Sequence, residues 1–424
     1  MLTVFPDSAR IDEGELRLGG RSAAELAEEF GTPLVVYCEE TLRGRARTFR
    51  DAVGERGRVF YGTKAFPNVA LLELFREESV GADVAAAGEL AFARRAGLAG
   101  ADLVVHGNNK DEGFLRAAAR EAAPVVVDAP DEVALAAAAG VEQMLVRVTV
   151  GVDADTHEAI VTGHHGSKFG LPPAQAQEAV AEALALGLDV LGLHVHVGSQ
   201  LPDFTAQAET IRRLTEFAAS CRAALGWEAR VADLGGGFGI RHLPGDEVPD
   251  AGELARAAVQ TTREAFVAQG LPTPDVWLEP GRSLVGRAGV TLYRVGAVKR
   301  LAERTWVAVD GGMSDNPRPQ LYDATYTALS AARADEPTDE TVSVAGMHCE
   351  SGDVLIDDVD LPSPRRGDLL AVPATGAYTL AMASNYNLAT RPAAVLVGAG
   401  EARLARRRET VDDLLEFEDS PAGG

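Results

Sequence analysis

The sequence predicts an α/β plus all-β protein, in which a (β/α)8 TIM barrel precedes a C-terminal β-sandwich or β-barrel domain. Between residues 58 and 283, eight short apolar runs alternate with segments rich in Ala, Leu and Glu that have helical spacing. Beyond residue 285, short strand-like runs and turns replace the helical segments. Polar side chains gather where the apolar runs end, which is the functional face of such a barrel.

The barrel is expected to occupy residues 33–285. Its strands are predicted at residues 58–64, 81–87, 103–109, 124–130, 144–151, 190–199, 231–239 and 276–283. Continuous apolar strands that alternate with helices indicate a parallel sheet, and eight such units favour closure into a barrel. A doubly wound open sheet is the alternative. An earlier apolar run, residues 33–40, leads into a helix before the barrel core begins.

The rest of the chain is expected to form the second domain. Residues 286–424 contain runs such as GVTLYRVGAVKRL and RRGDLLAVPATGAY, with almost no helical spacing, which indicates an all-β domain. Residues 1–32 include the alternating stretch ARIDEGELRLGG, which is typical of a strand. This N-terminal segment is therefore expected to join the β domain.

Composition disfavours several classes of protein. Sixty-three acidic and 40 basic residues give a formal charge of −23, which argues against a nucleic-acid or anionic-membrane partner. Three cysteines, Cys38, Cys221 and Cys349, are too few and too scattered for a disulfide framework or a zinc site. The sequence shows neither a signal peptide nor an apolar run long enough to span a bilayer. A cytoplasmic location is therefore expected.

A lone lysine, Lys64, stands at the end of the first barrel strand in VFYGTKAFPN. A lysine in such a place usually lays its stem on apolar surface and extends its ammonium group to water. The alternative is a catalytic amine with a lowered pKa that can form a Schiff base. The alternative gains weight because His106, His194, His196 and Glu279 also stand at strand ends.

A glycine run follows the seventh strand. In DLGGGFGI, Gly235, Gly236 and Gly237 form at the least a tight turn. Their exposed N–H groups could also hold a phosphate, and barrels often bind phosphate after strands seven and eight. Position therefore favours phosphate binding.

A carboxylate and two histidines complete the predicted site. Glu279, in LEPGRS, either pairs with the adjacent Arg282 or holds a proton on the ring nitrogen of pyridoxal phosphate, which strengthens the ring as an electron sink. His194 and His196 could suggest a metal, but no third ligand stands at metal spacing. An imidazole stacked on a flat cofactor, with Ser199 near its phosphate, fits better, so no metal is expected.

Seven motifs together resemble the diaminopimelate decarboxylases, which are pyridoxal-phosphate enzymes of the alanine-racemase-like fold type. They are YGTKAF, HVHVGSQ, DLGGGFG, EPGRS, GGMSDNPRPQLYDA, HCESGDVL and GAYTLAMASNYN, and they occur in order over nearly the whole chain. The last two are highly specific, whereas the barrel motifs alone would also admit ornithine- and arginine-type relatives. The resemblance implies decarboxylation of meso-2,6-diaminopimelate to L-lysine and carbon dioxide, the last step of lysine biosynthesis.

The resemblance also implies roles for individual residues. It makes Lys64 the Schiff-base lysine and Cys349 the proton donor, and it assigns cofactor contacts to His196, Ser199, Gly235, Gly236, Gly237, Glu279, Gly281, Arg282 and Tyr378. It assigns substrate binding to Arg282, Arg318, Tyr322, Glu350 and Tyr378. In the family, Cys349 and Glu350 would complete the active site of the other subunit of a homodimer.

Three other functions remain open on the sequence alone. An amino-acid racemase would need a tyrosine base opposite the lysine, and Cys349 in HCESGD speaks against it. A decarboxylase of another amino acid, serving a secondary pathway, would share the barrel motifs. A cofactor-carrier protein with the same barrel would lack the β domain that residues 286–424 are expected to form.

Overall fold

The computed structural model describes residues 1–152 and 167–419. The chain forms two compact units. The barrel unit comprises Arg43–Ile240 and Val248–Leu284, and the sheet unit comprises Met1–Leu42, Arg241–Glu247 and Val285–Gly424.

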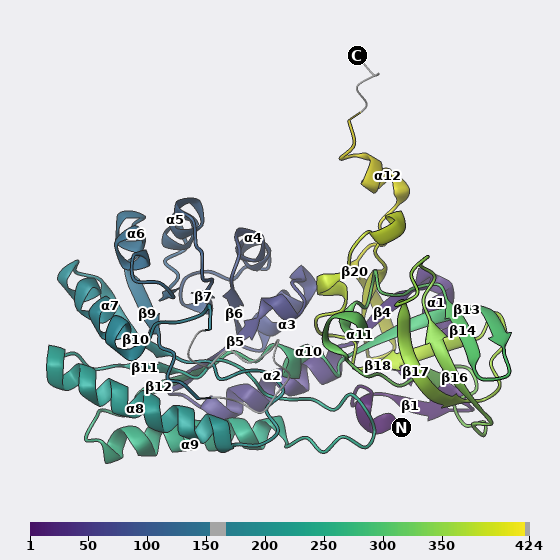
Figure 1. Ribbon diagram of the computed structural model, residues 1–424, viewed down its shortest axis with the longest axis horizontal. Coiled ribbons are helices and arrows are strands. Elements are labelled where there is room, and N and C mark those ends of the chain that lie inside the picture. The colour runs from purple at the N-terminus through teal and green to yellow at the C-terminus, as the bar shows by residue number, and fades with distance from the viewer. Residues whose placement is uncertain (153–166, 420–424) are drawn as a thin grey trace. The chain divides into compact units, whose positions relative to one another are not determined.

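Eight parallel strands of the barrel unit close into a barrel in the order β10-β11-β12-β5-β6-β7-β8-β9 (Figure 1). They are β5 (Gly57–Gly62), β6 (Gly81–Val84), β7 (Leu103–Val105), β8 (Val125–Val127), β9 (Gln143–Arg147), β10 (Asp189–His194), β11 (Val231–Asp233) and β12 (Asp275–Leu278). Each coincides with a predicted run. The predicted TIM barrel is confirmed, and the open-sheet alternative is wrong because β5 pairs with β12.

Each of the first seven barrel strands is followed by a helix. These helices are α3 (Val69–Glu77), α4 (Ala87–Arg95), α5 (Glu112–Arg120), α6 (Glu132–Ala138), α7 (Pro173–Ala185), α8 (Thr205–Leu225) and α9 (Ala251–Ala268). Side-chain caps mark several of their starts: Asp111 accepts from the Phe114 N–H, and Asp250 from the Glu253 N–H. The interior of the barrel is packed by Phe60, Val104, Val126, Leu145, Val231 and Trp277. The filled interior leaves the chemistry to the strand ends.

The sheet unit contains a nine-stranded sheet and a small three-stranded one. The large sheet consists of β4 (Leu34–Cys38), β13 (Gly289–Arg300), β14 (Thr305–Val309), β15 (Leu329–Ser330), β16 (Glu340–Ala345), β17 (Val354–Leu361), β18 (Leu369–Pro373), β19 (Ala393–Gly398) and β20 (Glu401–Arg406). The small sheet consists of β1 (Arg10–Asp12), β2 (Glu15–Leu18) and β3 (Arg21–Ser22), and helix α1 (Ala23–Phe30) follows it.

Strand β13 organises the sheet unit because its alternate residues enter two different hydrophobic cores. Val290 and Leu292 belong to the core that also contains residues of β2, β4 and β19, whereas Tyr293 and Val295 belong to the core beneath β14, β16 and β17. A register shift between Val295 and Ala297 marks the point where the pairing of β13 with β14 begins. The second domain, expected to be all-β, is a mostly-sheet unit that also contains helix α1.

The division into units differs from the expected boundary at residue 33. The run at residues 33–40 forms β4, all five residues of which are buried. β4 pairs antiparallel with β13 and parallel with β19, so it is a central strand of the sheet unit. The barrel unit therefore begins at Arg43, within α2 (Glu39–Val53).

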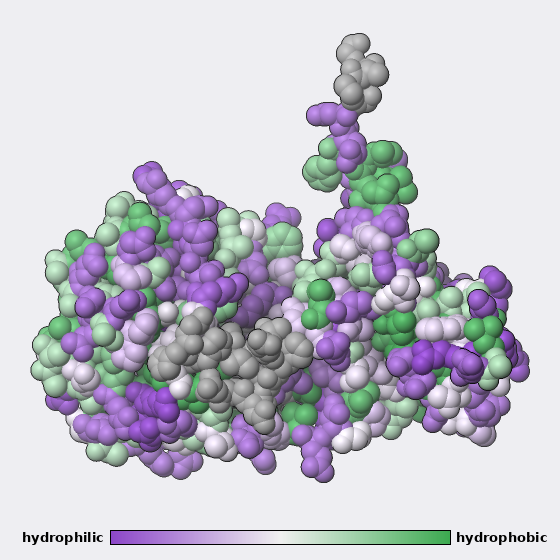
Figure 2. All heavy atoms as spheres, in the orientation of Figure 1, coloured by the Kyte–Doolittle hydropathy of each residue, from purple (hydrophilic) through white to green (hydrophobic). Residues whose placement is uncertain are grey.

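Hydrophilic side chains cover much of the face seen in Figure 2. The segment at α12 (Val411–Leu415) departs from this pattern, since Val411, Leu415 and Phe417 are exposed. Over residues 1–152 and 167–419, no helix combines the length and the hydrophobicity needed to cross a membrane.

Candidate active site

Lys64 lies where the first barrel strand ends. β5 runs into the short 3₁₀ helix η2 (Thr63–Ala65), on which the Lys64 side chain is exposed. The Gly62 N–H donates to the Pro280 carbonyl at 3.2 Å. The Thr63 hydroxyl donates to the Asp83 carbonyl at 2.7 Å. These bonds tie the backbone that carries Lys64 to the ends of β12 and β6.

The glycine loop after β11 packs directly against His196 and Glu279. Gly235 and Gly237 have φ values of +64° and +99°, which favour glycine. A Cβ atom on Gly235 would lie 2.5 Å from Nδ1 of His196, and one on Gly236 would lie 2.5 Å from the Glu279 carbonyl oxygen. The structure thus brings the three predicted elements together, and only residues without a side chain fit between them.

Two N–H groups of this loop already have partners within the chain. The Gly235 N–H donates to Oδ1 of Asp233 at 2.9 Å, and the Gly236 N–H donates to Nδ1 of His196 at 3.2 Å. The second bond fixes the orientation of the His196 ring. Phosphate binding by the loop stays a prediction.

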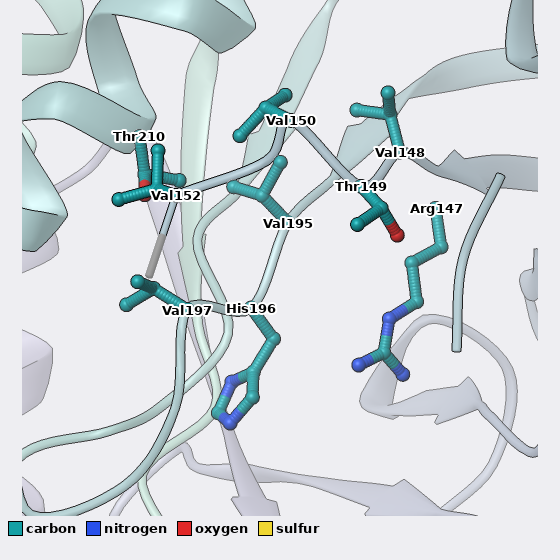
Figure 3. A pocket seen from close by; sticks show the side chains of 9 residues that line it. All are labelled: Arg147, Val148, Thr149, Val150, Val152, Val195, His196, Val197 and Thr210. Atoms are coloured by element: carbon teal, nitrogen blue, oxygen red, sulfur yellow. The ribbon is translucent and has the colours of Figure 1, made fainter. Parts of the chain in front are cut away.

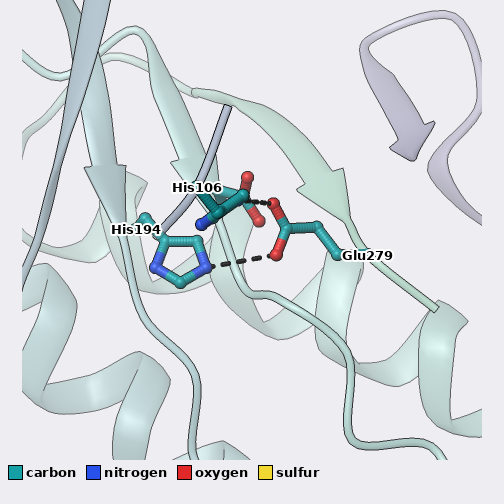
Figure 4. Close-up of side chains that lie close together, drawn as sticks. His106, His194 and Glu279 are labelled. Carbon is teal, nitrogen blue, oxygen red and sulfur yellow. Dashed lines mark hydrogen bonds and ion pairs between the residues drawn. The ribbon is translucent and has the colours of Figure 1, made fainter. Parts of the chain in front are cut away.

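Glu279 follows β12 and is held by two histidines (Figure 4). Its Oε1 lies 2.5 Å from Nε2 of His106, which follows β7, and its Oε2 lies 3.2 Å from Nε2 of His194, the last residue of β10. All three side chains are buried, and the imidazole rings meet edge to face at 4.8 Å. Both oxygens of the predicted ring-nitrogen partner therefore have hydrogen-bond donors.

Burial and hydrogen bonding determine which member of the trio His106, His194 and Glu279 is charged. Burial lowers the pKa of His106 to about 4 and also lowers the pKa of His194, so both imidazoles are neutral near pH 7. Burial by itself raises the pKa of Glu279, but the two histidines lower it well below its usual range. Glu279 is therefore the ionised member.

Two buried aspartates and a partly buried arginine that the sequence did not assign lie at the same end of the barrel. Asp83 in β6 approaches Nε2 of His106 to 3.9 Å, and Asp233 ends β11. Burial and the charge of Glu279 raise the pKa of both aspartates well above their usual range. Arg147 ends β9 and lies 3.6 Å from Asp128. No local signal marks these residues, because each lies inside a predicted strand.

The ligand atoms of His106, His194, Asp233 and Glu279 lie within 4.8 Å of one another, a spacing that could also hold a metal ion. The hydrogen bonds described above already use both oxygens of Glu279 and one nitrogen of each histidine. A metal would have to replace these bonds. The arrangement fits a hydrogen-bonded carboxylate better than a set of metal ligands.

His106 should remain neutral down to about pH 4, because its burial opposes the charged form. Its folded pKa lies below the value near 6.5 of an unfolded chain. The contribution of this group to stability is thus fully present above about pH 6.5 and is lost as the pH falls toward 4. An NMR titration of the histidine Cε1–H resonances, assigned with His106→Phe, checks this. A His106 resonance that titrates near pH 6.5 would contradict a buried neutral imidazole.

Arg282 and Ser199, both expected near the cofactor phosphate, lie side by side. Arg282 is the buried first residue of α10 (Arg282–Val285), and its guanidinium group donates a long hydrogen bond of 3.5 Å to Oγ of Ser199. Gly281, the residue before Arg282, is half-buried. A cation and a hydroxyl group therefore stand together beside the glycine loop.

A small pocket adjoins His196 (Figure 3). Val150, Val152 and Val197 form its apolar wall. His196 and Arg147 extend their polar groups toward the same side of it. The pocket therefore borders the residue whose ring is expected to cover the cofactor.

In the sheet unit, α11 (Arg318–Tyr322) gathers three predicted substrate residues. The buried guanidinium group of Arg318 lies 5.8 Å from the ring centre of Tyr322 and 6.0 Å from that of Tyr378. Tyr378 follows β18 and has a φ of +59°, an uncommon conformation for a bulky residue. Among the described residues, Nε of Arg318 has no hydrogen-bond partner, as suits a cation that awaits an anionic ligand.

Cys349 and Glu350 lie exposed on the loop between β16 and β17. Asn387 accepts from the Cys349 N–H at 3.3 Å, and the His348 ring lies 2.8 Å from Oγ of Ser314. Asp353, which is only 3% exposed, accepts from the N–H groups of Met313 and His348. This carboxylate ties the Cys349 loop to the segment before α11.

Asp353→Ala should destabilise the sheet unit by about 2–5 kcal/mol, because a buried N–H group and a part-buried one would each lose a charged acceptor. Urea denaturation measures the change. Asp358→Ala is the matched control, since Asp358 is an exposed aspartate on β17 and should change stability by less than about 0.5 kcal/mol. Equal effects of the two substitutions would show that Asp353 does not anchor the loop.

Comparisons with known proteins agree with the motifs. The family model described as "Pyridoxal-dependent decarboxylase, pyridoxal binding domain" matches residues 39–286. The diaminopimelate decarboxylase of Actinosynnema pretiosum is 47% identical over 98% of this chain and 95% of its own, and that of Bacillus subtilis is 44% identical over 97% of both. The crystal structure of the M. jannaschii diaminopimelate decarboxylase in complex with L-lysine superimposes with a TM-score of 0.92 at 33% identity, covering 99% of each chain.

Proposed function

Since the chain belongs to the diaminopimelate decarboxylase family of pyridoxal-dependent decarboxylases, we propose that it converts meso-2,6-diaminopimelate to L-lysine and carbon dioxide, the last step of lysine biosynthesis. The cofactor is pyridoxal 5′-phosphate. Similarity over nearly the full length of both chains carries this conclusion. It covers the barrel residues and the sheet-unit residues alike.

The barrel residues fit the cofactor. The absence of side chains at Gly235 and Gly236 lets the loop backbone pack against His196 and Glu279, and an ionised Glu279 suits a protonated pyridine nitrogen. Lys64 would bind the aldehyde carbon, His196 would cover the ring, and Ser199, Gly281, Arg282 and the Gly235–Gly237 loop would hold the phosphate. The cofactor supplies the electron sink for the charge left when the carboxylate departs.

The remaining site residues fit a substrate with an amino-acid centre at each end. Arg318, with Arg282, suits the distal carboxylate, because a guanidinium group pairs with it bidentately. Glu350 suits the distal ammonium, and Tyr322 and Tyr378 flank Arg318. Cys349 holds the proton that the decarboxylated carbon receives. A substrate with a single distal amine, such as ornithine, would not need the arginines.

Purified protein supplied with pyridoxal phosphate and meso-diaminopimelate should release lysine and carbon dioxide in equal amounts. Coupled detection of both products tests this. Faster release of carbon dioxide from ornithine would favour the second candidate, a decarboxylase of another amino acid, which the barrel motifs alone would also permit.

We further propose a homodimer in which Cys349 and Glu350 complete the site of the partner subunit. The chemistry that these motifs imply needs both Lys64 and Cys349, and the two residues belong to different units of the chain. Large apolar side chains are also exposed around Cys349: Leu321, Met347 and Leu388 are 56%, 52% and 75% exposed. Such a set of apolar side chains is typical of an interface.

Mixing two inactive variants tests the shared site. Lys64→Ala and Cys349→Ala homodimers should each be nearly inactive. In a hybrid dimer with a shared site, one site carries both defects and the other carries neither. Random exchange of equal amounts makes about half of the dimers hybrid, so roughly a quarter of wild-type activity should return. If activity stays at the level of the variants after mass spectrometry confirms chain exchange, each site lies within one chain.

A cytoplasmic location is proposed on the composition. The cysteines are free, with Cys38 and Cys221 buried and Cys349 exposed, as is usual in a reducing compartment.

A further inference from the structure

The hydrogen bonds between His106, His194 and Glu279 reach across the barrel mouth. They link residues at the ends of β7, β10 and β12, and each histidine bonds a different oxygen of the carboxylate (Figure 4). We infer that His106 and His194 are positioning residues, which hold Glu279 ionised and aimed so that it selects a cofactor ring with a protonated nitrogen. This inference rests on the proposed function and deepens it.

The tautomers follow from the geometry. An ionised carboxylate only accepts hydrogen bonds, so Nε2 of each histidine must carry a hydrogen. In a neutral imidazole the other nitrogen is then a bare acceptor. Nδ1 of His194 is buried and has no partner among the described residues, which is less costly for a bare nitrogen than for an N–H group.

The neutrality of the histidines matters for the charge at the site. Two imidazolium groups would more than cancel the charge of Glu279, and the resulting net positive charge would repel a protonated pyridine ring. Burial keeps both imidazoles neutral, so the trio keeps a net charge of −1. Two neutral donors therefore stabilise the carboxylate without competing for its charge.

The surrounding groups show why Glu279 needs this support. Asp83 and Asp233 approach from β6 and β11, and burial together with the charge of Glu279 favours their protonated forms. Glu279 is equally buried, and its burial opposes ionisation in the same way. Glu279 differs from these aspartates because it accepts a hydrogen bond from each of the two histidines, and these bonds lower its pKa.

The selectivity of cofactor binding tests the inference without relying on turnover. Apo enzyme is titrated with pyridoxal phosphate and with its 1-deaza analogue, in which a C–H group replaces the ring nitrogen. Wild-type protein should bind pyridoxal phosphate at least about tenfold more tightly, since one charge-assisted hydrogen bond is at stake. His106→Phe and His194→Phe should each lose most of this preference and should bind the deaza analogue within about threefold of wild type.

The deaza analogue also reports whether each variant still folds its binding site. Should a phenylalanine variant fail to fold, His106→Gln and His194→Gln serve as a second pair, because a glutamine amide can still donate to Glu279 and should retain part of the preference. Equal losses of affinity for pyridoxal phosphate and for the deaza analogue would overturn the inference, since they would indicate a damaged pocket rather than a lost charge on Glu279. An unchanged preference in the phenylalanine variants would also overturn it. Failure of wild-type protein to bind pyridoxal phosphate would instead count against the proposed function.

Discussion

Lys64→Ala should lower kcat for meso-diaminopimelate by at least about a thousandfold and abolish the covalent attachment of the cofactor. The methyl side chain of alanine cannot replace an amine that bonds the cofactor directly. Loss of such a nucleophile lowers the rate by several orders of magnitude. Steady-state kinetics give the loss in kcat.

The same assignment can be checked chemically in wild-type protein. Borohydride reduction should leave a pyridoxyl group on Lys64, which peptide mass spectrometry locates. The sequence offers few alternatives, since its other lysines are Lys110, Lys168 and Lys299. Lys110 is buried in an ion pair with Glu132 at 2.8 Å, and Lys299→Ala on β13 serves as a control that should keep full labelling. A pyridoxyl group recovered on another lysine would refute the role of Lys64.

Wild-type enzyme should prefer meso-diaminopimelate to lysine or ornithine by at least about a thousandfold in kcat/KM. A site built to bind a polar group rejects an analogue that lacks it, because its own buried polar groups are left unpaired. This penalty should be largest at Arg318, because Arg318 is buried and its Nε lacks a hydrogen-bond partner among the described residues.

Variants of Arg318 and Glu350 test separately how the distal carboxylate and the distal ammonium of the substrate are recognised. Arg318→Lys keeps the charge but loses the bidentate geometry, so kcat/KM for meso-diaminopimelate should fall by about a hundredfold while the low activity on lysine stays nearly unchanged. Glu350→Gln should act in the same direction. A similar fall for both substrates would mean that the two residues support the fold of the site rather than the distal centre.

The barrel could be predicted because its strands are short, apolar on both faces and separated by helices. β4 shows the limit of that signal. Its sequence, LVVYC, reads like a barrel strand, yet it pairs with β13 and β19, which lie far along the chain. Hydrophobic periodicity reports burial on both faces and does not report which strands will be neighbours.

The candidate site shows the same contrast. Lys64, His196, the Gly235–Gly237 loop and Glu279 could be proposed as site residues because each lies in a local motif. The partners of Glu279 could not be assigned, because they depend on how the ends of separate strands converge. His106 carried no signal beyond its place at a strand end, and Asp83 stood inside a predicted strand. The strand ends meet only when the barrel closes, so no single segment of the sequence shows which of their residues will be neighbours.

The central claim is that the chain decarboxylates meso-diaminopimelate and protonates the same carbon. Since the product is L-lysine, the carboxylate must leave the D-configured centre, which becomes the ε-carbon of lysine. Turnover in deuterated water, followed by NMR and mass spectrometry, should therefore give L-lysine with one non-exchangeable deuterium on Cε, in an amount equal to the carbon dioxide released. Deuterium at the α-carbon of unconsumed diaminopimelate, without release of carbon dioxide, would indicate a racemase and would contradict the claim.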